Sequence, residues 1–275
     1  TPPSGYTLFC NEVNTALEFD GVDDYVEIPD DSSFHFDENK SFTFSFWVRR
    51  KDYPPSDYTY GLGMPYRYAF RIMPSGYIRF GVREYGTANL NEVTGGFLNT
   101  NQWYFVSATY DANNKKLKIY VNAVEKDSTD VTISFPGSYA ALNIGHCTCA
   151  GNAGYFNGTI DEVRIYNRAL TSQEISSLYN NTYANSTGLV LYLKFNELEG
   201  NTAIDSSTYG NNGTIYGAEY TTSTPFDEIE YATKLNSTYA NITKIYPSET
   251  LYVRCYMNVT RPNYLWPVKI YGKVE

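Results

Sequence analysis

Residues 156–179 constrain the fold of this chain more than any other stretch. Val163 and Ile165 alternate with polar neighbours, which is the pattern of a half-buried strand. An Asn-Arg-Ala sequence ends that pattern. Thr171 and Glu174 then have the spacing of a capping box, in which each side chain bonds the other residue's backbone amide. The stretch therefore predicts a strand, a turn and one short capped helix.

The rest of the composition favours β structure. The chain has 28 Tyr and 15 Phe, and aromatic and β-branched residues suit a pleated, half-buried surface. Phe42, Phe44, Phe46 and Val48 fall on one face of a strand pattern and Thr43, Ser45 and Trp47 on the other, as expected of a core strand. Short strands of this kind, separated by turn signals, predict a two-sheet antiparallel sandwich.

Three motifs occur in order between residues 16 and 179. Ala-Leu-Glu-Phe-Asp-Gly-Val-Asp-Asp-Tyr-Val-Glu-Ile-Pro occupies 16–29, Lys-Ile-Tyr-Val-Asn occupies 118–122, and Ile-Asp-Glu-Val-Arg-Ile-Tyr-Asn-Arg-Ala-Leu occupies 160–170. Together they resemble the LamG-like domains of the concanavalin A-like lectin/glucanase superfamily. The resemblance implies an all-β, antiparallel, two-sheet jelly-roll sandwich over residues 16–182.

A further family-like segment, residues 188–220, stands in an unexpected place. In LamG-like domains a segment of this kind precedes the opening Phe-Asp-Gly motif, whereas here it follows the helix. Residues 183–226 are expected to complete the same sandwich, as in a circular permutation, to begin a second truncated domain, or to be donated as a strand to a neighbouring subunit. Residues 1–15 are expected to form an arm or edge strand, and residues 227–275 a small β module or interaction arm.

Net charge and hydropathy exclude two classes of partner. The net charge of −9 and the pI of about 4.8 argue against nucleic acid, because phosphate binding needs clustered Lys and Arg. No apolar stretch approaches the roughly 20 residues of a membrane span. The chain begins Thr1-Pro2-Pro3, without a methionine or a signal peptide, and we interpret it as a processed or excised mature chain.

The cysteines predict two disulfides. They are Cys10, Cys147, Cys149 and Cys255. Cys147 and Cys149 are too close to pair without strain, so we expect Cys10–Cys147 with Cys149–Cys255, or the swapped pairs. A metal site at His146-Cys147-Thr148-Cys149 is the weaker interpretation, because a second CxxC or a spaced His pair is missing.

Asn-x-Ser/Thr sequons predict N-linked glycans and an extracellular surface. They begin at Asn39, Asn157, Asn180, Asn185, Asn212, Asn236, Asn241 and Asn258.

The resemblance also implies a structural Ca²⁺ ion. In many LamG-like domains such an ion lies between the opening turn and the closing strand. By motif match its ligands here are Asp20, the carbonyl of Gly21, and Asp161, with Asp23 and Asp24 as alternatives. Several hard oxygen ligands are what Ca²⁺ requires.

Tyrosines predict a sugar-binding platform, because an aromatic face can stack on a sugar while the hydroxyl orients it. We expect residues 51–68 to form a loop that carries most of them, with one more in a following loop. The candidate ligand-binding residues are Tyr53, Tyr58, Tyr60, Tyr66 and Tyr85.

Three functions follow from these patterns. The first is a non-catalytic extracellular surface protein that binds carbohydrate or a cell-surface ligand in adhesion. The second is a glycosylated subunit of an extracellular filament or coat, joined to copies of itself by strand donation. The third, a glycoside hydrolase, is weak, because the nearest carboxylate motif, Glu18-Phe19-Asp20-Gly21-Val22-Asp23, lacks the final Glu of the glucanases.

Overall fold

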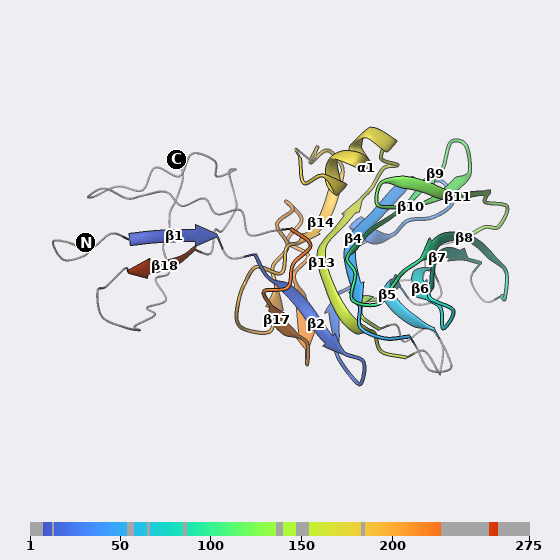
Figure 1. The fold of residues 1–275 in the computed structure, drawn as a ribbon. Coiled ribbons are helices and arrows are strands. Elements are labelled where there is room, and N and C mark those ends of the chain that lie inside the picture. Colours follow the sequence, from blue (N-terminus) through green and yellow to red (C-terminus); the bar gives the residue numbers. More distant parts are fainter. Residues whose placement is uncertain are drawn as a thin grey trace.

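The computed structural model describes residues 8–12, 14–53, 58–64, 67–84, 87–135, 140–146, 154–182, 185–226 and 253–257. These residues form two large sheets, a two-stranded sheet and one α-helix, and strands paired within each sheet are antiparallel (Figure 1). The all-β jelly-roll sandwich expected from the sequence is confirmed.

The first sheet has eight strands. Seven follow the order β11–β10–β9–β4–β13–β2–β17, and β14 also pairs with β13. Their bounds are β2 Ala16–Asp20, β4 Phe42–Arg50, β9 Tyr104–Asp111, β10 Lys116–Val121, β11 Val124–Asp130, β13 Asn157–Tyr166, β14 Leu189–Leu193 and β17 Glu219–Thr221.

The second sheet also has eight strands, in the order β15–β16–β3–β12–β5–β6–β7–β8. Their bounds are β3 Tyr25–Ile28, β5 Thr59–Met64, β6 Tyr68–Ile72, β7 Tyr77–Arg83, β8 Leu90–Phe97, β12 Leu142–Ile144, β15 Thr202–Ala203 and β16 Gly213–Tyr216. A single 3₁₀ turn, Ser32–Phe34, follows β3.

The core lies between the two sheets. Phe42, Phe44, Phe46 and Val48 of β4 are fully buried in it, as the alternation predicted. The intervening side chains of β4 are buried too. Burial on both faces follows from a second layer, the helix, which covers the other side of the first sheet.

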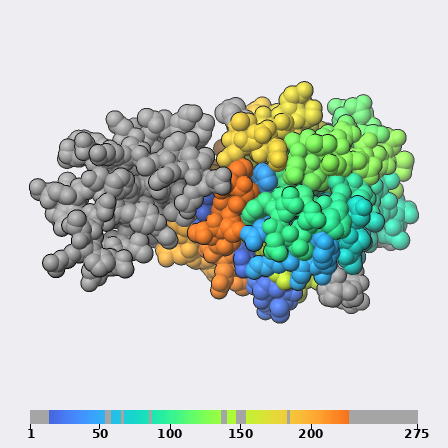
Figure 2. Space-filling model, viewed as in Figure 1, coloured from blue at the N-terminus to red at the C-terminus, as the bar shows by residue number. Residues whose placement is uncertain are grey.

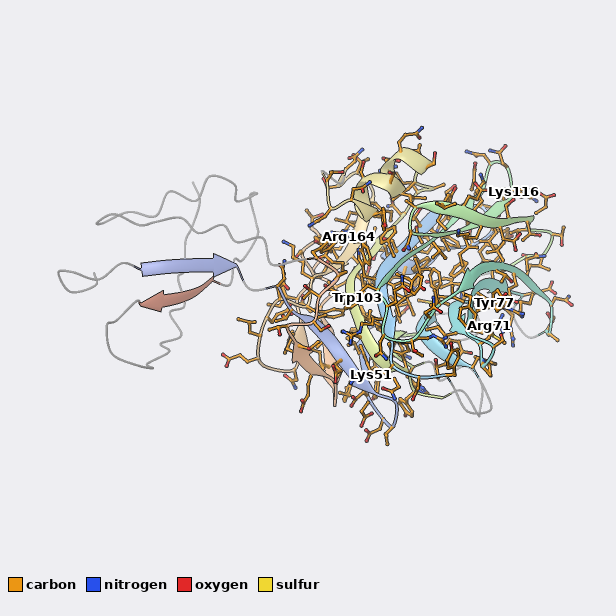
Figure 3. All side chains as sticks on the ribbon, in the orientation of Figure 1. Lys51, Arg71, Tyr77, Trp103, Lys116 and Arg164 are labelled. Atoms are coloured by element: carbon orange, nitrogen blue, oxygen red, sulfur yellow. The ribbon has the colours of Figure 1, made fainter. Side chains whose placement is uncertain are left out.

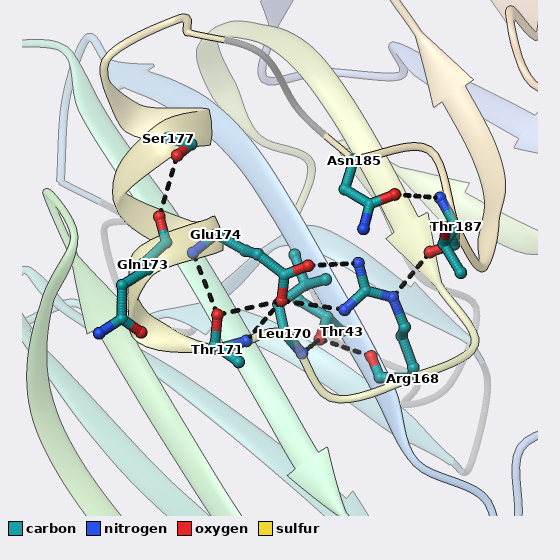
Figure 4. A network of polar contacts seen from close by, with 9 residues as sticks. All are labelled: Thr43, Arg168, Leu170, Thr171, Gln173, Glu174, Ser177, Asn185 and Thr187. Carbon is teal, nitrogen blue, oxygen red and sulfur yellow. Dashed lines mark hydrogen bonds and ion pairs between the residues drawn. The ribbon is translucent and has the colours of Figure 1, made fainter.

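The helix α1, Ser172–Tyr179, has the predicted capping box. Thr171 Oγ1 accepts from the Glu174 amide at 3.3 Å, and the Glu174 carboxylate accepts from the Thr171 amide at 2.9 Å (Figure 4). The helix packs on the outer face of the first sheet, where Tyr179 stacks on Trp47 of β4. Ile175 is fully buried in the same cluster.

Arg168 fastens the start of this helix to the chain that follows it (Figure 4). Its Nη2 lies 2.6 Å from Glu174 Oε1, and its Nε donates to the Thr187 carbonyl at 2.7 Å. The guanidinium therefore ties the capping box to the segment that enters β14.

The displaced segment completes the sandwich within the same chain. β14 pairs with β13 and β17 pairs with β2 (Figure 1), and β16 pairs with β3. The structure thus contains the first of the three expected arrangements, a circularly permuted sandwich, and residues 16–182 and 185–226 share one core.

A separate pair of strands is formed by β1, Leu8–Glu12, and β18, Val253–Met257. The register places Cys10 opposite Cys255. The pairs expected from the sequence join these two residues instead to Cys147 and Cys149, which lie outside the described residues. Of the rest of the predicted arm and C-terminal module, only residues 14 and 15 are described, and Thr15 is buried with its amide bonded to Asn196 Oδ1 at 2.8 Å.

The expectation of one loop over residues 51–68 is wrong, because β5 occupies Thr59–Met64. A register shift between Tyr60 and Leu62 interrupts the alternation of this strand. Gly61 and Gly63 add no side chain to its pattern. A bulged strand with two glycines lacks the period-2 signal that identifies the other strands.

Candidate ligand-binding face of the second sheet

The outer face of β5–β8 carries polar and aromatic side chains. On β7, Ile78, Phe80 and Val82 point into the core and are buried. Because successive side chains of a strand point to opposite faces, the alternate positions face outward. These positions are Tyr77, Arg79, Gly81 and Arg83.

The neighbouring strands continue this face in register. Arg71 of β6 lies opposite Arg79, and Tyr60 of β5 lies opposite Arg71. On β8, Glu92 lies opposite Gly81. The face therefore runs across four strands without interruption.

A shallow pocket of about 40 Å³ opens on this face. Its lining contains tyrosines, arginines and apolar groups, and three of its residues are arginines. The lining residues are Tyr58, Tyr60, Met64, Arg67, Tyr68, Ala69, Arg71, Gly81, Arg83 and Leu90.

Two tyrosines form one wall of the pocket. The rings of Tyr58 and Tyr60 meet edge to face, with centroids 5.4 Å apart. Tyr58 is half-buried, whereas Tyr60 is only 4% exposed, and burial raises the pKa of its hydroxyl. A hydrogen bond between the Tyr58 and Tyr60 hydroxyls also favours the protonated form of Tyr60.

Arg71 of the pocket and the neighbouring Arg79 share one carboxylate. Arg79 Nη1 lies 3.0 Å from Glu92 Oε1, and Arg71 bonds the other oxygen of Glu92. The Arg71 guanidinium carbon lies 5.4 Å from the centre of the Tyr58 ring. Gly81 keeps this space open, because a Cβ there would lie 2.8 Å from Leu90 Cδ1.

An exposed aromatic patch lies at the other end of β7. Tyr77 and Phe97 are 43% and 42% exposed, and their rings meet edge to face at 5.8 Å. Tyr53 joins them with its ring 3.6 Å from the guanidinium carbon of Arg50. Six residues separate Tyr77 from Arg83, or roughly 20 Å along the strand. Figure 3 shows Tyr77 and Arg71 together on this sheet, apart from the labelled Arg164 and Lys51.

The geometry agrees with the match to known families. The sequence pattern of the concanavalin A-like lectin/glucanases superfamily matches residues 20–176. The chain belongs to this superfamily.

A solved structure shows the same fold, and two further ones are similar to part of this chain. A candidate carbohydrate-binding protein from Bacteroides ovatus is 23% identical, with a TM-score of 0.58; the match covers 76% of this chain and 60% of that one. The CBM40 of a Ruminococcus gnavus sialidase is 16% identical, with a TM-score of 0.47 and coverage of 61% and 98%. A SAP-like pentraxin from Limulus polyphemus is 12% identical, with a TM-score of 0.45 and coverage of 62% and 83%.

No curated protein matches this chain. The match to the Bacteroides protein spans about 60% of that protein's length. Within the described ranges, no helix is long and apolar enough to cross a membrane.

In this superfamily member, the predicted tyrosines are divided. Tyr58 and Tyr60 line the pocket, and Tyr53 belongs to the aromatic patch. Tyr66 and Tyr85 lie outside the described residues. Sequence reasoning missed Arg71 and Arg83, although their alternation with the buried residues of β6 and β7 marks them as outward-facing.

The expected Ca²⁺ ligands are only partly brought together. Carboxylate oxygens of Asp20, Asp23 and Asp24 lie within 4.8 Å of one another, beside the turn at Gly21. Asp20 lies opposite Asn157 in the register of β13. Asp161 is four residues farther along that strand, or about 13 Å away. The structure therefore does not bring Asp161 to the cluster, whereas it does bring the two alternatives.

Asp161 belongs instead to a buried polar network. It is 3% exposed, and its Oδ1 accepts from the Glu162 amide at 2.8 Å. Arg164 bonds Glu162 and the Tyr192 hydroxyl. Burial, and then the charge of Glu162, raise the pKa of Asp161. These contacts join β13 to β14, which is a structural role.

The remaining candidates occupy ordinary surroundings. Glu18 of the incomplete carboxylate motif pairs with Lys51. His146 stacks on Tyr155 with ring centroids 4.1 Å apart, while the two cysteines that follow it lie outside the described residues. His35 pairs with Asp30 at 2.9 Å.

The sequons differ in how accessible they are. Asn39 and Asn185 are exposed, and so are Asn180 and Asn212. Asn157 is half-buried in β13, and its Nδ2 donates to Asp52 Oδ2 at 2.6 Å. The other three, Asn236, Asn241 and Asn258, lie outside the described residues.

Proposed function

We propose that this chain is a non-catalytic carbohydrate-binding protein whose ligand lies on the outer face of β5–β8. The observation that carries the proposal is the pocket in which Tyr58 and Tyr60 stand beside outward-facing arginines. Carbohydrate has apolar ring faces and hydroxyl edges. A tyrosine ring packs against the apolar ring face, and guanidinium and phenol groups form hydrogen bonds with the hydroxyls.

The whole face suits an extended ligand better than a single sugar. The pocket and the patch of Tyr53, Tyr77 and Phe97 lie at opposite ends of β7. The patch residues are more than 40% exposed, so their rings are free to stack. The superfamily and the description of the Bacteroides protein as a candidate carbohydrate-binding protein support the same function.

The residues that line the pocket favour binding of carbohydrate without its hydrolysis. Glycoside hydrolysis uses two carboxyl groups on either side of the scissile bond. The ten residues that line the pocket are aromatic, apolar or cationic, apart from one glycine.

The proposed setting is the cell exterior, in adhesion to a glycan or cell-surface ligand. The exposed sequons at Asn39 and Asn185 support it. Assembly of a filament by strand donation has less support, because β14–β17 pair within their own chain.

A glycan array followed by calorimetry tests the proposal. The full chain is expected to bind at least one glycan class, and Tyr58→Ala is expected to weaken that binding tenfold or more. Tyr209→Ala is the matched control, since Tyr209 is 51% exposed and lies outside the pocket lining and the aromatic patch. Unchanged binding by Tyr58→Ala, or no binding to any glycan, would show the proposal to be wrong.

A further inference from the structure

The pocket is too small for a whole sugar ring. Its volume of about 40 Å³ is roughly three times what one water molecule needs. Pockets that enclose a small molecule are usually about 300 Å³ or more. A sugar that binds here therefore lies on the rim and inserts one substituent, of the size of a carboxylate or a sulfate group.

The charge of the pocket is opposite to that of the chain. The chain carries a net charge of −9. Three of the ten residues that line the pocket are arginines, and the lining contains no Asp or Glu. Positive charge is thus concentrated at this pocket.

This positive charge is only partly neutralised by the protein. Arg71 and Arg79 share the single carboxylate of Glu92. Arg83 makes no ion pair with any residue in the described part of the chain. Burial, with the nearby charge of Arg83, lowers the pKa of Arg71. The guanidinium groups of Arg71 and Arg83 therefore repel each other, and an anion bound between them would remove that unfavourable electrostatic free energy.

We propose that this pocket binds the carboxylate or sulfate group of an acidic sugar between Arg83 and Arg71, while the ring of that sugar rests on Tyr58. The proposal rests on the carbohydrate-binding function proposed above and names its ligand class. A planar guanidinium offers paired N–H donors that match the oxygens of either anion.

Pairs of oligosaccharides that differ only in the acidic group test this inference. One pair is tetragalacturonate and its methyl ester, which differ only in the carboxylate, and the other is a sulfated chondroitin tetrasaccharide and its desulfated form, which differ only in the sulfate. With the full chain in calorimetry, the member of at least one pair that carries the tested group is expected to bind ten times more tightly than its partner or better. The two pairs distinguish carboxylate from sulfate as the preferred group.

The variant Arg83→Gln is expected to remove most of that preference and to leave weak binding of the neutral sugar. Arg83→Lys should restore part of it, since a point charge remains without the planar fork. Lys116→Gln is the control, because it removes one positive charge from the other sheet (Figure 3).

Four outcomes would overturn the inference. If the two members of each pair bind equally, the ligand class is wrong although carbohydrate binding stands. If the acidic preference survives Arg83→Gln, the anion binds elsewhere. If a single-stranded oligonucleotide binds as tightly as the acidic sugar and is equally sensitive to Arg83→Gln, the pocket is a general polyanion site. If no member of either pair and no glycan on the array binds, the proposed function fails together with the inference.

Discussion

Thr221, the last residue of β17, lies directly opposite Ala16, the first residue of β2. The segment that contains β14–β17 precedes the opening motif in LamG-like domains, so in that order these two strands would follow each other as a hairpin. Here Ala16 begins the first strand of the sandwich and Thr221 ends the last one, while the residues just beyond Thr221 still pack on the first sheet, where Phe226 contacts Trp47. The sandwich is therefore complete, and only the order in which the chain passes through it differs. Figure 2 shows the orange segment that ends the sandwich lying beside blue segments from the first part of the chain.

Restoring that order should preserve the fold. In a variant that begins at residue 185, passes through 226, continues by a short Gly-Ser linker to Ala16 and ends at 182, every pair of strands within the two large sheets is retained. We expect a cooperative thermal transition within a few degrees of the natural order. Loss of cooperative unfolding, measured by circular dichroism, would contradict a single shared core.

The cysteine register predicts a disulfide between Cys10 and Cys255. Residues directly opposite on antiparallel strands have Cα atoms about 4.5–5.5 Å apart, which is within the span of a disulfide. Mass spectrometry of a non-reduced digest should find a peptide that links these two residues. A digest that instead links Cys10 to Cys147 or Cys149 would favour the pairing expected from the sequence.

Calcium should stabilise the chain through the cluster of Asp20, Asp23 and Asp24. Burial, and then the charges of its neighbours, raise the pKa of Asp24, and a cation would remove the cost of that repulsion. At a hundredfold excess over the dissociation constant, binding adds about 2.7 kcal/mol. A domain of this size should then melt roughly 5–10 °C higher than in chelator.

The variants separate the two ligand sets. Asp23→Asn should abolish the calcium-induced rise in melting temperature, whereas Asp161→Asn should leave it intact. A rise that Asp161→Asn abolishes would restore Asp161 to the ligand set. No rise in the natural chain would remove calcium from consideration.

The helix cap should fail in acid. A hydrogen bond from Arg168 lowers the pKa of Glu174 to about 2, below its ordinary 4.5. Because the folded pKa is the lower one, this stabilisation is complete above pH 4.5 and is lost as the pH falls towards 2.

Glu174→Gln should therefore cost about 1–2 kcal/mol of unfolding free energy at pH 7 and little at pH 2. Urea titrations at both pH values measure the difference. Glu125→Gln is the control, because its ion pair with Lys118 is exposed and should contribute under about 0.5 kcal/mol. An equal effect of Glu174→Gln at both pH values would show that the ion pair does not stabilise the cap.

Glycan occupancy should follow accessibility. In a host that glycosylates sequons, glycopeptide mass spectrometry should find glycan on the exposed Asn39 and Asn185. Asn157 should be unmodified, since its Nδ2 is bonded to Asp52 and its backbone is paired with Asp20. A glycan on Asn157 would mean that modification precedes folding of β13.

Local sequence signals predicted the parts of the fold that depend on local structure. The capping box at Thr171 located the helix, and the alternation from Phe42 located β4. The bulged strand β5 escaped because its signal is not periodic. Whether residues 188–220 complete their own sandwich depends on pairing between strands far apart in the chain, which no local pattern specifies.

The candidate site was predictable only in part for the same reason. Tyr58 and Tyr60 were found by residue type, because aromatic rings suggest sugar binding wherever they occur. Arg71 and Arg83 could not be recognised as site residues from the sequence, because only the pairing of β6 with β7 brings both guanidinium groups to one pocket. Asp161 was predicted to be a Ca²⁺ ligand by motif match, but the register of β13 places Asn157, not Asp161, opposite Asp20.

The pairing of Ala16 with Thr221 also determines how the sandwich would respond to a pulling force, because both ends of the sandwich segment lie on neighbouring strands. Two antiparallel strands drawn apart from the same end open one rung at a time, at low force. Along the chain β1 precedes β2 and β18 follows β17, so a load on the two ends of the chain reaches the β1–β18 pair first. A disulfide between these two strands would let tension pass from one side to the other without straining the sandwich, and the proposed ligand-binding face on β5–β8 would keep its shape under load.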